Sequence, residues 1–513
     1  MLYVPLYIEA IRSRPVWVFW LATLSQALLW FLVPMLLYAA PPGDLAQLLA
    51  VGRELRLDGN VGPPLAYWLA EIAFRLGGMF GVYTLSQLCV ITTYWCVFTL
   101  GKAIVGAAHA AMAVLLMVGI TLFTVPTPDF GPPILAMALW ALLLTHYWRA
   151  VMQGERRSWY VLGAAAALLL LTTDAALILL GTLVVFTAAT ERGRAALDAI
   201  EPWIVAVALT VFLFVHLLWL EGSGDALTPL LKRLRAADSA GTNTMAWLRL
   251  IGLLVFAHAG LAILVALAGG WPRADAGPAP AITRPPVDPL ALTFVKTLTL
   301  VPALLATIVA VLVGNPLPIG GGAPLVVLSG IAVVIAAGGS VALFHQRILG
   351  FAWAGLLIVP ALLVPLAMFL LPWTIGIDLK VAQPARAMGR FFAASFERRT
   401  GRPLAIVTGD ARTAALVALG APSRPSVFFD ADPSRSPWVT VDDIRKKGAV
   451  VVWLTPDTTP TPPPDIKAYF PDLVPEVPIA FERQVQGRLP LLRVGWGVIR
   501  PGSVAPAAAP ARR

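Results

Sequence analysis

The sequence predicts a polytopic α-helical membrane protein that carries a C-terminal α/β domain outside the membrane. Hydrophobic residues make up 58% of the 513-residue chain and charged residues only 13%, and the mean hydropathy is +0.79. Soluble globular proteins carry about 25% charged residues. An ordinary soluble protein is therefore excluded, and most of the chain is expected to lie in a lipid bilayer.

The charged residues are distributed unevenly along the chain. Residues 375–513 hold 19 of the 38 Lys and Arg residues and 12 of the 28 Asp and Glu residues. We therefore expect a membrane part at residues 1–374 and a soluble domain at residues 375–503. The net charge of +10 does not indicate a nucleic-acid partner, because basic residues in a membrane protein first mark the loops that face the cytoplasm.

Eleven apolar stretches are candidates for membrane-spanning helices, which need about 20 residues each. The first is interpreted as a retained span, because its apolar run from Val16 is longer than the 7 to 15 residues typical of a signal-peptide core. The stretches are 15–38, 83–103, 106–124, 133–150, 159–172, 174–190, 202–220, 246–269, 290–312, 323–343 and 349–372.

Basic residues in the short loops predict the orientation of these spans. If the spans alternate, one side collects a series of Lys and Arg residues from Arg12 and Arg14 to Arg347, and that side should be the cytoplasm. The N-terminus is then cytoplasmic, and the C-terminal domain is periplasmic because eleven is odd. We expect a multi-pass protein of the bacterial inner (plasma) membrane, in contact with membrane lipids.

The first outward segment, at about residues 41–82, is too polar to span the membrane. It contains helix-like stretches at Leu45–Leu57 and Leu65–Phe74, joined by the turn Asp58-Gly59-Asn60. Both stretches are expected to form amphipathic helices along the periplasmic membrane surface.

The C-terminal region has the pattern of an α/β domain. Leu404–Thr408 and Ala449–Leu454 are β-rich runs, while Thr440 to Asp443 form a capping-box pattern that opens a helix ended by Gly448. The last ten residues, 504–513, are rich in Pro and Ala and are predicted to be disordered.

Two outward acidic residues are the candidate catalytic groups. Asp44 follows Pro41-Pro42-Gly43 directly after the first span, where a lipid-linked substrate would present its head group. Asp129 lies in a later outward loop among prolines. Each has a structural alternative: Asp44 and Gln47 also fit a helix N-cap, and Asp129 also fits a turn residue.

Asp174 interrupts an apolar region, since Leu168–Thr172 and Ala175–Leu180 flank it. It lies either at a tight outward turn or inside the bilayer. A carboxylate at mid-membrane costs about 2.5 to 3.5 kcal/mol on insertion scales, which favours the turn or a functional cavity.

Basic residues that face away from the cytoplasm are candidates for binding a lipid phosphate. Solvation or contact with anionic head groups is the alternative. The sequence contains no P-loop, no dinucleotide-binding glycine motif and no Cys or His cluster at zinc spacing. The sequence therefore identifies no definite cofactor, and a requirement for a divalent metal ion stays an open alternative. The basic candidates are Arg53, Arg56, Lys232, Arg233 and Arg235.

The pattern resembles the GT-C membrane glycosyltransferases, in the branch that contains protein O-mannosyltransferases, the lipid A aminoarabinose transferase and RgtA/B/C/D-like enzymes. The similarity covers roughly residues 10–370. Its most specific part is Pro63 to Leu69, which resembles the Pro-Pro-Leu-x-Tyr-Trp-Leu segment of that branch. Gly43-Asp44, Asp129 and the polar break at 172–174 agree by position.

This resemblance implies a GT-C-type fold and a polyprenyl-phosphate sugar donor. It also implies an outward cavity in which Asp44 binds or deprotonates the acceptor hydroxyl and Asp129 is the second acid. Tyr67 of the matching segment and Asp174 become candidate substrate-binding residues. Displacement at the sugar carbon would invert its configuration, with the lipid phosphate as leaving group.

The chain departs from its relatives at several positions. Many relatives have Asp-Glu at Asp44-Leu45, Tyr at Leu48, Lys at Gly62 and Lys-Gly at Thr173-Asp174. The leading hypothesis is a glycosyltransferase that acts on an envelope lipid, glycan or protein and uses the outward arginines in place of the lysines. The alternative is a non-catalytic protein that binds or transports lipid-linked glycans.

Overall fold

The computed structural model describes residues 4–55, 62–222, 240–269, 281–313, 317–343, 345–456, 458–459 and 461–502. Several predictions fall outside these ranges and stay predictions. They are the phosphate-binding roles of Arg56, Lys232, Arg233 and Arg235, the turn at Asp58-Gly59-Asn60, and the disordered tail at 504–513.

The chain divides into two compact units that interleave along the sequence. The first, called the bundle here, comprises Met1–Leu32, Leu57–Ala66 and Tyr83–Leu362. The second, called the α/β unit, comprises Val33–Arg56, Tyr67–Val82 and Leu363–Arg513. This division differs from a single boundary at residue 374, because the outer segment after the first span packs with the C-terminal domain.

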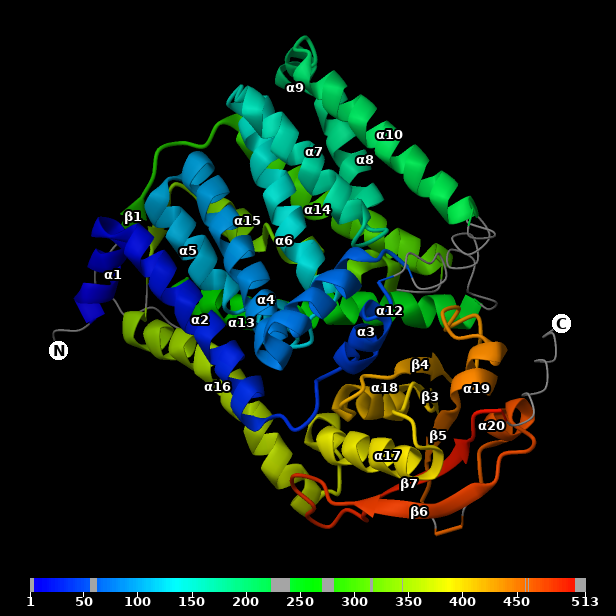
Figure 1. Ribbon diagram of the computed structural model, residues 1–513. Helices are drawn as coiled ribbons and strands as arrows, with labels where there is room; N and C mark the ends of the chain where they lie inside the picture. Colours follow the sequence, from blue (N-terminus) through cyan, green and yellow to red (C-terminus); the bar gives the residue numbers. More distant parts are fainter. Residues whose placement is uncertain are drawn as a thin grey trace. The chain divides into compact units, whose positions relative to one another are not determined.

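A helix lies within each of the eleven stretches predicted to span the membrane, although the stretch 323–343 holds only the short helix α15 and also includes strand β2 (Figure 1). The helices of the membrane part are α1 (Val4–Ser13), α2 (Pro15–Leu37), α4 (Leu65–Val105), α5 (Ala107–Met117), α6 (Pro132–Tyr147), α7 (Arg156–Leu170), α8 (Ala176–Ala189), α9 (Glu191–Ala196), α10 (Glu201–Gly222), α12 (Ala240–Ala257), α13 (Ala259–Ala268), α14 (Pro289–Val313), α15 (Ser329–Ala336) and α16 (Gln346–Thr374). A short antiparallel pair, β1 (Ala281–Thr283) and β2 (Ser340–Ala342), completes this part.

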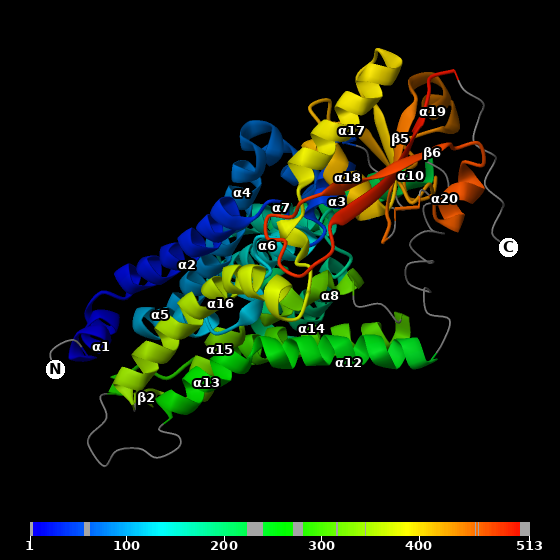
Figure 2. The same cartoon turned by 90° about the horizontal axis from the view of Figure 1, so that it is seen from below.

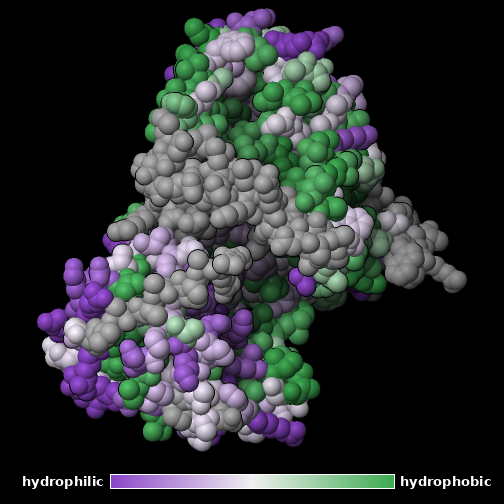
Figure 3. All heavy atoms as spheres, turned by 90° about the vertical axis from the view of Figure 1, so that its right-hand side faces the viewer, coloured by the Kyte–Doolittle hydropathy of each residue, from purple (hydrophilic) through white to green (hydrophobic). Residues whose placement is uncertain are grey.

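In the part of the chain that the structure describes, six stretches of helix are long and apolar enough to cross a membrane, as judged by length and composition. Large apolar side chains on them are exposed, among them Phe351 at 79% and Leu312 at 72%. On the face drawn in Figure 3, hydrophobic residues gather over the helices of the bundle. The chain is therefore a membrane protein. The other five stretches coincide with α5, α7, α8, α10 and α15, so the number of eleven spans stays a prediction.

Helix α4 contains both the predicted outer helix and the next predicted span. Its backbone leaves helical geometry at Gly77 (φ −148°, ψ 17°) and Gly78 (φ 60°, ψ −144°), which makes a kink between two helical segments. The φ of Gly78 lies in the left-handed region, which a residue without a Cβ adopts at little cost. The two glycines therefore separate 65–76 from the apolar helix that follows.

The α/β unit is built on a five-stranded sheet with the order β4-β3-β5-β7-β6. Strands β3, β4 and β5 are parallel, whereas β7 is antiparallel to both β5 and β6. The bounds are β3 (Ile406–Gly409), β4 (Ser426–Phe429), β5 (Ala449–Leu454), β6 (Pro475–Phe481) and β7 (Leu492–Ile499). The two β-rich runs predicted from sequence are confirmed as β3 and β5.

Helices pack on this sheet and link its parallel strands, as Figure 2 shows from below. Helix α18 (Ala411–Gly420) joins β3 to β4, and α19 (Val441–Lys447) joins β4 to β5. Thr440 and Asp443 form the predicted capping box, and Gly448 ends α19. The remaining helices of the unit are α3 (Leu45–Gly52), α17 (Ala385–Thr400) and α20 (Pro464–Tyr469).

Candidate catalytic and phosphate-binding residues

Asp44 stands at the end of a tight turn that begins α3. The Leu45 backbone N–H donates to the Pro42 carbonyl at 3.2 Å, and Gly43 has a φ of 48°, which favours glycine at this position. The Asp44 side chain is exposed and makes no capping hydrogen bond, although the residue occupies the N-cap position. The N-cap alternative predicted for this carboxylate is therefore wrong, and within the described residues no hydrogen bond to the carboxylate is found.

The reason lies in the backbone of Asp44 itself. Preferred N-cap residues have extended backbone angles that bring the side-chain oxygen over the first free N–H groups. Asp44 instead has φ −103° and ψ 9°, the geometry of the third residue of a turn. Its carboxylate is consequently left at the surface, available to a ligand.

Helix α3 is shorter than predicted. It ends at Gly52 rather than at Leu57, and the chain turns through Leu55, whose φ is 49°. Gly52 lies directly against the start of α4, because a Cβ on it would stand 2.3 Å from the Tyr67 carbonyl oxygen. This close backbone contact holds Arg53 next to the outer part of α4, which carries Tyr67.

Arg53 joins a cluster of charged side chains that we call the arginine cluster: Arg53, Glu71, Arg75 and Arg424. Glu71 is 3% exposed and receives hydrogen bonds from Arg75 Nε at 2.9 Å and from Arg424 Nη2 at 2.7 Å. Arg75 also donates to the Arg53 carbonyl at 3.5 Å. Two guanidinium groups therefore share one buried carboxylate, and Arg53 joins them through its backbone carbonyl.

The environment of Arg424 shows that this cluster has an excess of positive charge. Burial is the largest effect on the pKa of Arg424 and lowers it. Glu71 opposes that effect, and repulsion from Arg53 and Arg75 lowers the pKa further. The guanidinium also stacks on Phe74, with 4.3 Å from its carbon to the ring centroid. A bound anion would relieve this repulsion.

Arg53 also has a possible structural role, which is the alternative to phosphate binding. A cation near the C-terminus of α3 interacts favourably with the helix dipole. Its Nη1 atom is buried and has no hydrogen-bond partner among the described residues, and Oε1 of the adjacent Glu54 is in the same condition. The cluster can thus serve as an ion-pair fastening between α4 and the sheet domain, as an anion site, or as both.

Asp129 lies in a turn of the bundle, as its structural alternative predicts. Its backbone N–H donates to the Pro126 carbonyl at 3.0 Å, and the residue is half-buried. The turn is fixed to α4, because Ser86 Oγ donates to the Thr127 carbonyl and Gln87 Nε2 donates to Thr127 Oγ1 at 3.3 Å. A fixed turn is compatible with a functional carboxylate, since it presents Asp129 in one orientation.

Asp174 lies in the turn between α7 and α8, which agrees with the turn interpretation of this residue. The Leu65 backbone N–H donates to the Leu171 carbonyl at 2.9 Å. The start of the Pro-Pro-Leu-x-Tyr-Trp-Leu segment and the polar break at 172–174 therefore meet in space, although about a hundred residues separate them in sequence.

The predicted site residues fall into two groups. Asp44, Arg53 and Tyr67 belong to the α/β unit, whereas Asp129 and Asp174 belong to the bundle. Asp44 and Arg53 stand at opposite ends of α3, roughly 13 Å apart at 1.5 Å per residue. The sequence analysis did not identify Arg75 or Arg424 as site residues. The i, i+4 spacing of Glu71 and Arg75 is a local signal, whereas nothing local indicates Arg424.

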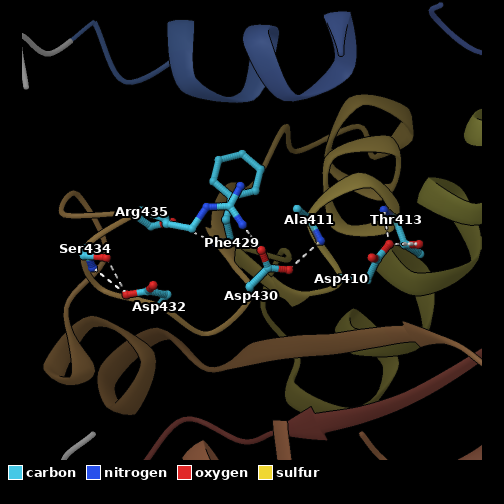
Figure 4. Close-up of polar contacts among 9 residues, drawn as sticks. Asp410, Ala411, Thr413, Phe429, Asp430, Asp432, Ser434 and Arg435 are labelled. Atoms are coloured by element: carbon cyan, nitrogen blue, oxygen red, sulfur yellow. Dashed lines mark hydrogen bonds and ion pairs between the residues drawn. The ribbon is translucent and has the colours of Figure 1, made fainter. Parts of the chain in front are cut away.

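Carboxylates also gather where β3 and β4 end, as Figure 4 shows, but each of them has a structural partner. Asp410 accepts from the Thr413 backbone N–H at 2.9 Å, and Asp430 accepts from the Ala411 N–H at 3.1 Å. Asp432 accepts from Ser434. In the part of the chain that the structure describes, no group of three His, Cys, Asp or Glu residues is arranged to hold a metal ion.

Comparisons with known proteins agree with this architecture. The family model of dolichyl-phosphate-mannose-protein mannosyltransferases matches residues 61–219. A search of curated proteins by sequence finds no match. Among solved structures, ArnT from Cupriavidus metallidurans bound to undecaprenyl phosphate is similar with a TM-score of 0.57 and 14% identity, over 95% of this chain and 98% of that one.

The apo state of the same ArnT gives a TM-score of 0.55 at 14% identity, over 93% of this chain and 97% of that chain. The archaeal oligosaccharyltransferase AglB from Archaeoglobus fulgidus, in complex with an inhibitory peptide and a dolichol-phosphate, gives 0.40 at 12% identity, over 86% and 70%. The two ArnT matches cover nearly the whole chain. They confirm the GT-C fold, including the sheet-containing C-terminal region, that the sequence resemblance predicts.

Proposed function

We propose that this chain, a membrane protein with the GT-C fold, transfers a sugar from a polyprenyl-phosphate donor to an envelope lipid, glycan or protein at the periplasmic face. The observation that carries the proposal is the state of Asp44. Its carboxylate is exposed and not engaged in capping, on a turn held in one geometry. A carboxylate in this state can accept a proton from a substrate.

In the proposed reaction Asp44 is the general base. The acceptor hydroxyl oxygen bonds to the anomeric carbon while the bond from that carbon to the phosphate oxygen breaks. The hydroxyl proton moves to Asp44, and the polyprenyl phosphate leaves with the bonding electron pair. A single displacement of this kind inverts the anomeric configuration. Asp129, on its fixed turn, is the second acidic residue of the proposed site.

The departing phosphate needs positive charge near it, and Arg53 is the proposed source among the described residues. The arginine cluster holds three arginines and one buried carboxylate, Glu71, which pairs with Arg75 and Arg424; this excess of positive charge supports an additional anionic partner. Tyr67 begins the same outer part of α4, and Gly52 lies against its carbonyl. Arg53 and Tyr67 are proposed to contact the donor, and Asp174 is proposed to contact the substrate.

The donor class is supported by the similarity to ArnT, whose solved structure is bound to undecaprenyl phosphate, and by the match to the mannosyltransferase family model. A non-catalytic protein that binds or transports lipid-linked glycans is the second candidate. It is favoured by Gly62 and Thr173, which stand where many relatives have lysine.

The test is sugar transfer by the purified protein in nanodiscs, with a panel of undecaprenyl-phosphate sugars and envelope extracts as acceptors, followed by mass spectrometry. Asp44→Asn should reduce transfer to background while the protein still assembles in the membrane. Arg53→Met should chiefly raise KM for the donor.

Asp472→Asn is the matched control. Asp472 is an exposed carboxylate of the same unit and should tolerate the change without loss of transfer. Undiminished transfer by the Asp44 variant would refute the assignment of the base. Donor binding without turnover, for every acceptor tried, would favour the non-catalytic candidate.

A further inference from the structure

The turn that presents Asp44 is held by residues more than 300 positions later in the chain. The backbone N–H groups of Ala39 and Ala40 both donate to the Val381 carbonyl, at 3.0 and 2.9 Å. Segment 39–44 therefore contacts the segment between α16 and α17 through its backbone. All of these residues belong to the α/β unit.

Arg412, the second residue of α18, completes this fastening. Its Nη1 donates to the Gly43 carbonyl, next to Asp44, and its Nη2 donates to the Lys380 carbonyl at 3.2 Å. Longer contacts reach the Pro41 carbonyl at 3.5 Å and Gln383 Oε1 at 3.4 Å. One guanidinium group thus holds both sides of the contact between segments 39–44 and 380–383.

The chemistry of the turn explains why a guanidinium is needed. Pro41 and Pro42 have no backbone N–H, so this segment forms few regular backbone hydrogen bonds, and its carbonyl groups need side-chain donors. Arginine offers five donors in a fixed plane, whereas lysine offers a single nitrogen. Four donor contacts to three carbonyl groups and one amide fit arginine alone.

Arg412 is itself held in place by the end of the sheet. Asp410 caps α18 through the Thr413 N–H and hydroxyl group, and Asp430 accepts from the Ala411 N–H at 3.1 Å. Figure 4 shows these carboxylates on either side of the helix start. The carboxylates at the ends of β3 and β4 therefore fix the helix that carries Arg412.

We infer that Arg412 is a positioning residue for Asp44, and that the α/β domain is a working part of the transfer site rather than a cover beside it. The inference rests on the proposed function, because Asp44 has to be the base. Arg412 acts through the backbone at Pro41 and Gly43. Its donor groups are engaged by protein oxygen atoms, which separates its role from that of a phosphate ligand such as Arg53.

The first test measures kinetics. Arg412→Met and Arg412→Lys should each lower kcat about 100-fold, because a displacement of about 1 Å costs that much, while KM for the donor changes less than about threefold. The shape of the pH profile should also change, since the base is no longer held in one environment. Arg445→Met, which removes an exposed arginine that pairs with its helix neighbour Asp442, is the control and should keep wild-type kcat.

The second test does not depend on activity. A spin label at Asp44→Cys, in a background with Cys89→Ala and Cys96→Ala, should become more mobile with Arg412→Met and stay unchanged with Arg445→Met. A label at Asp472→Cys reports whether the unit remains folded. Unchanged kcat and unchanged label mobility in both Arg412 variants would overturn the inference and leave the Asp44 assignment standing.

Retained transfer by Asp44→Asn would instead refute the proposed function, and with it the base that Arg412 positions. A fall in kcat with a label that stays immobile at position 44 would also overturn the positioning role. Lower kcat together with higher label mobility, in protein whose control label is unchanged, is the result that supports it.

Discussion

The bundle and the α/β unit differ in the charge of the side chains that make many of their internal hydrogen bonds. In the bundle, threonine hydroxyl groups donate to the carbonyl four residues earlier in their own helix, as Thr93 does to Cys89 at 2.8 Å and Thr182 to Ile178 at 2.7 Å. In the α/β unit, arginines reach partners far away in sequence. Arg424 pairs with Glu71, 353 residues before it, and Arg412 reaches Gly43, 369 residues before it.

This difference follows from the solvent that surrounds each region. Lipid provides no hydrogen-bond partners, so a helix in the bilayer keeps its polar groups paired within itself. Charges are costly there but can be paired in a region that meets water. Replacing a polar side chain of the bundle should therefore lower the free energy of unfolding more when its hydrogen-bond partner lies in another element than when it lies in the same helix. In the α/β unit, replacing a member of an ion pair should have the largest effect.

The largest effect on stability is expected at Glu71. Glu71→Gln removes the only carboxylate that pairs with both Arg75 and Arg424 in the described structure, and it leaves Arg424 partly buried beside two like charges. Removing one partner of a buried pair costs about 3 to 5 kcal/mol. Because Arg75 is exposed, we expect the lower limit, about 3 kcal/mol less free energy of unfolding.

Thermal unfolding of the purified protein in detergent measures this loss. Glu397→Gln is the matched control, because Glu397 is an exposed carboxylate on α17; it should change the free energy by less than about 0.5 kcal/mol. Equal stability of the two variants would show that the arginine cluster contributes little to holding α4 against the sheet domain.

The next effect concerns a polar contact between elements of the bundle. Gln26 is fully buried, donates to the Phe123 carbonyl at 2.5 Å and accepts from the Tyr94 hydroxyl at 3.1 Å. Gln26→Leu leaves both partners unpaired, which costs about 2 kcal/mol. The control is Thr93→Val, because Thr93 is buried directly before Tyr94. Its hydroxyl bonds only to its own helix, so this change should lower the free energy of unfolding by less than about 0.5 kcal/mol. A larger loss from Thr93→Val than from Gln26→Leu, measured by chemical unfolding, would contradict the comparison.

The smallest effect is expected at the capping box of α19. Thr440→Ala removes the cap of the Asp443 N–H and should cost about 1 kcal/mol. Thr182→Val in the bundle is the contrasting change, and it should be nearly neutral because the Ile178 carbonyl keeps its helical hydrogen bond. Hydrogen exchange at the amides of α19 and α8 would measure both, and similar losses at the two sites would contradict the distinction.

The same box gives a pH dependence with a definite sign. Hydrogen bonds from Lys447 and then Thr440 lower the pKa of Asp443 to about 2. The contribution of this carboxylate is therefore fully present above its ordinary pKa of about 4 and is lost as the pH falls toward 2. Exchange protection of α19 should decrease over that window in the wild type and less so in Asp443→Asn.

Several local features could be predicted because neighbouring residues determine them. The apolar stretches, the β-rich runs at β3 and β5, and the capping box at Thr440 all follow from spacing over a few residues. The position of Asp44 after the first span is of the same kind. Its side chain was harder to predict, because whether it caps α3 depends on the backbone angles of the turn.

The arginines of the site could not be found in this way. Arg412 and Arg424 occur in an ordinary surface-helix pattern and the loop after it. Glu71, the partner of Arg424, and two of the partners of Arg412, Pro41 and Gly43, lie in the first 80 residues. In the sequence, Glu71 is one of several acidic residues in the segments predicted to face outward. Only the folded structure pairs it with Arg424. Long-range ion pairs have no periodicity, so composition and spacing carry no information about them.

By itself, the sequence determined that this protein enters the membrane and that a region with β-strands follows its apolar part, since hydropathy, the distribution of charge and β-rich runs are local properties of the sequence. Tertiary structure decided that the outer segment belongs to the α/β unit, that the Asp44 side chain does not cap α3, and that Arg412 holds the turn before Asp44. The physical reason is that a side chain's partners are set by packing between segments hundreds of residues apart.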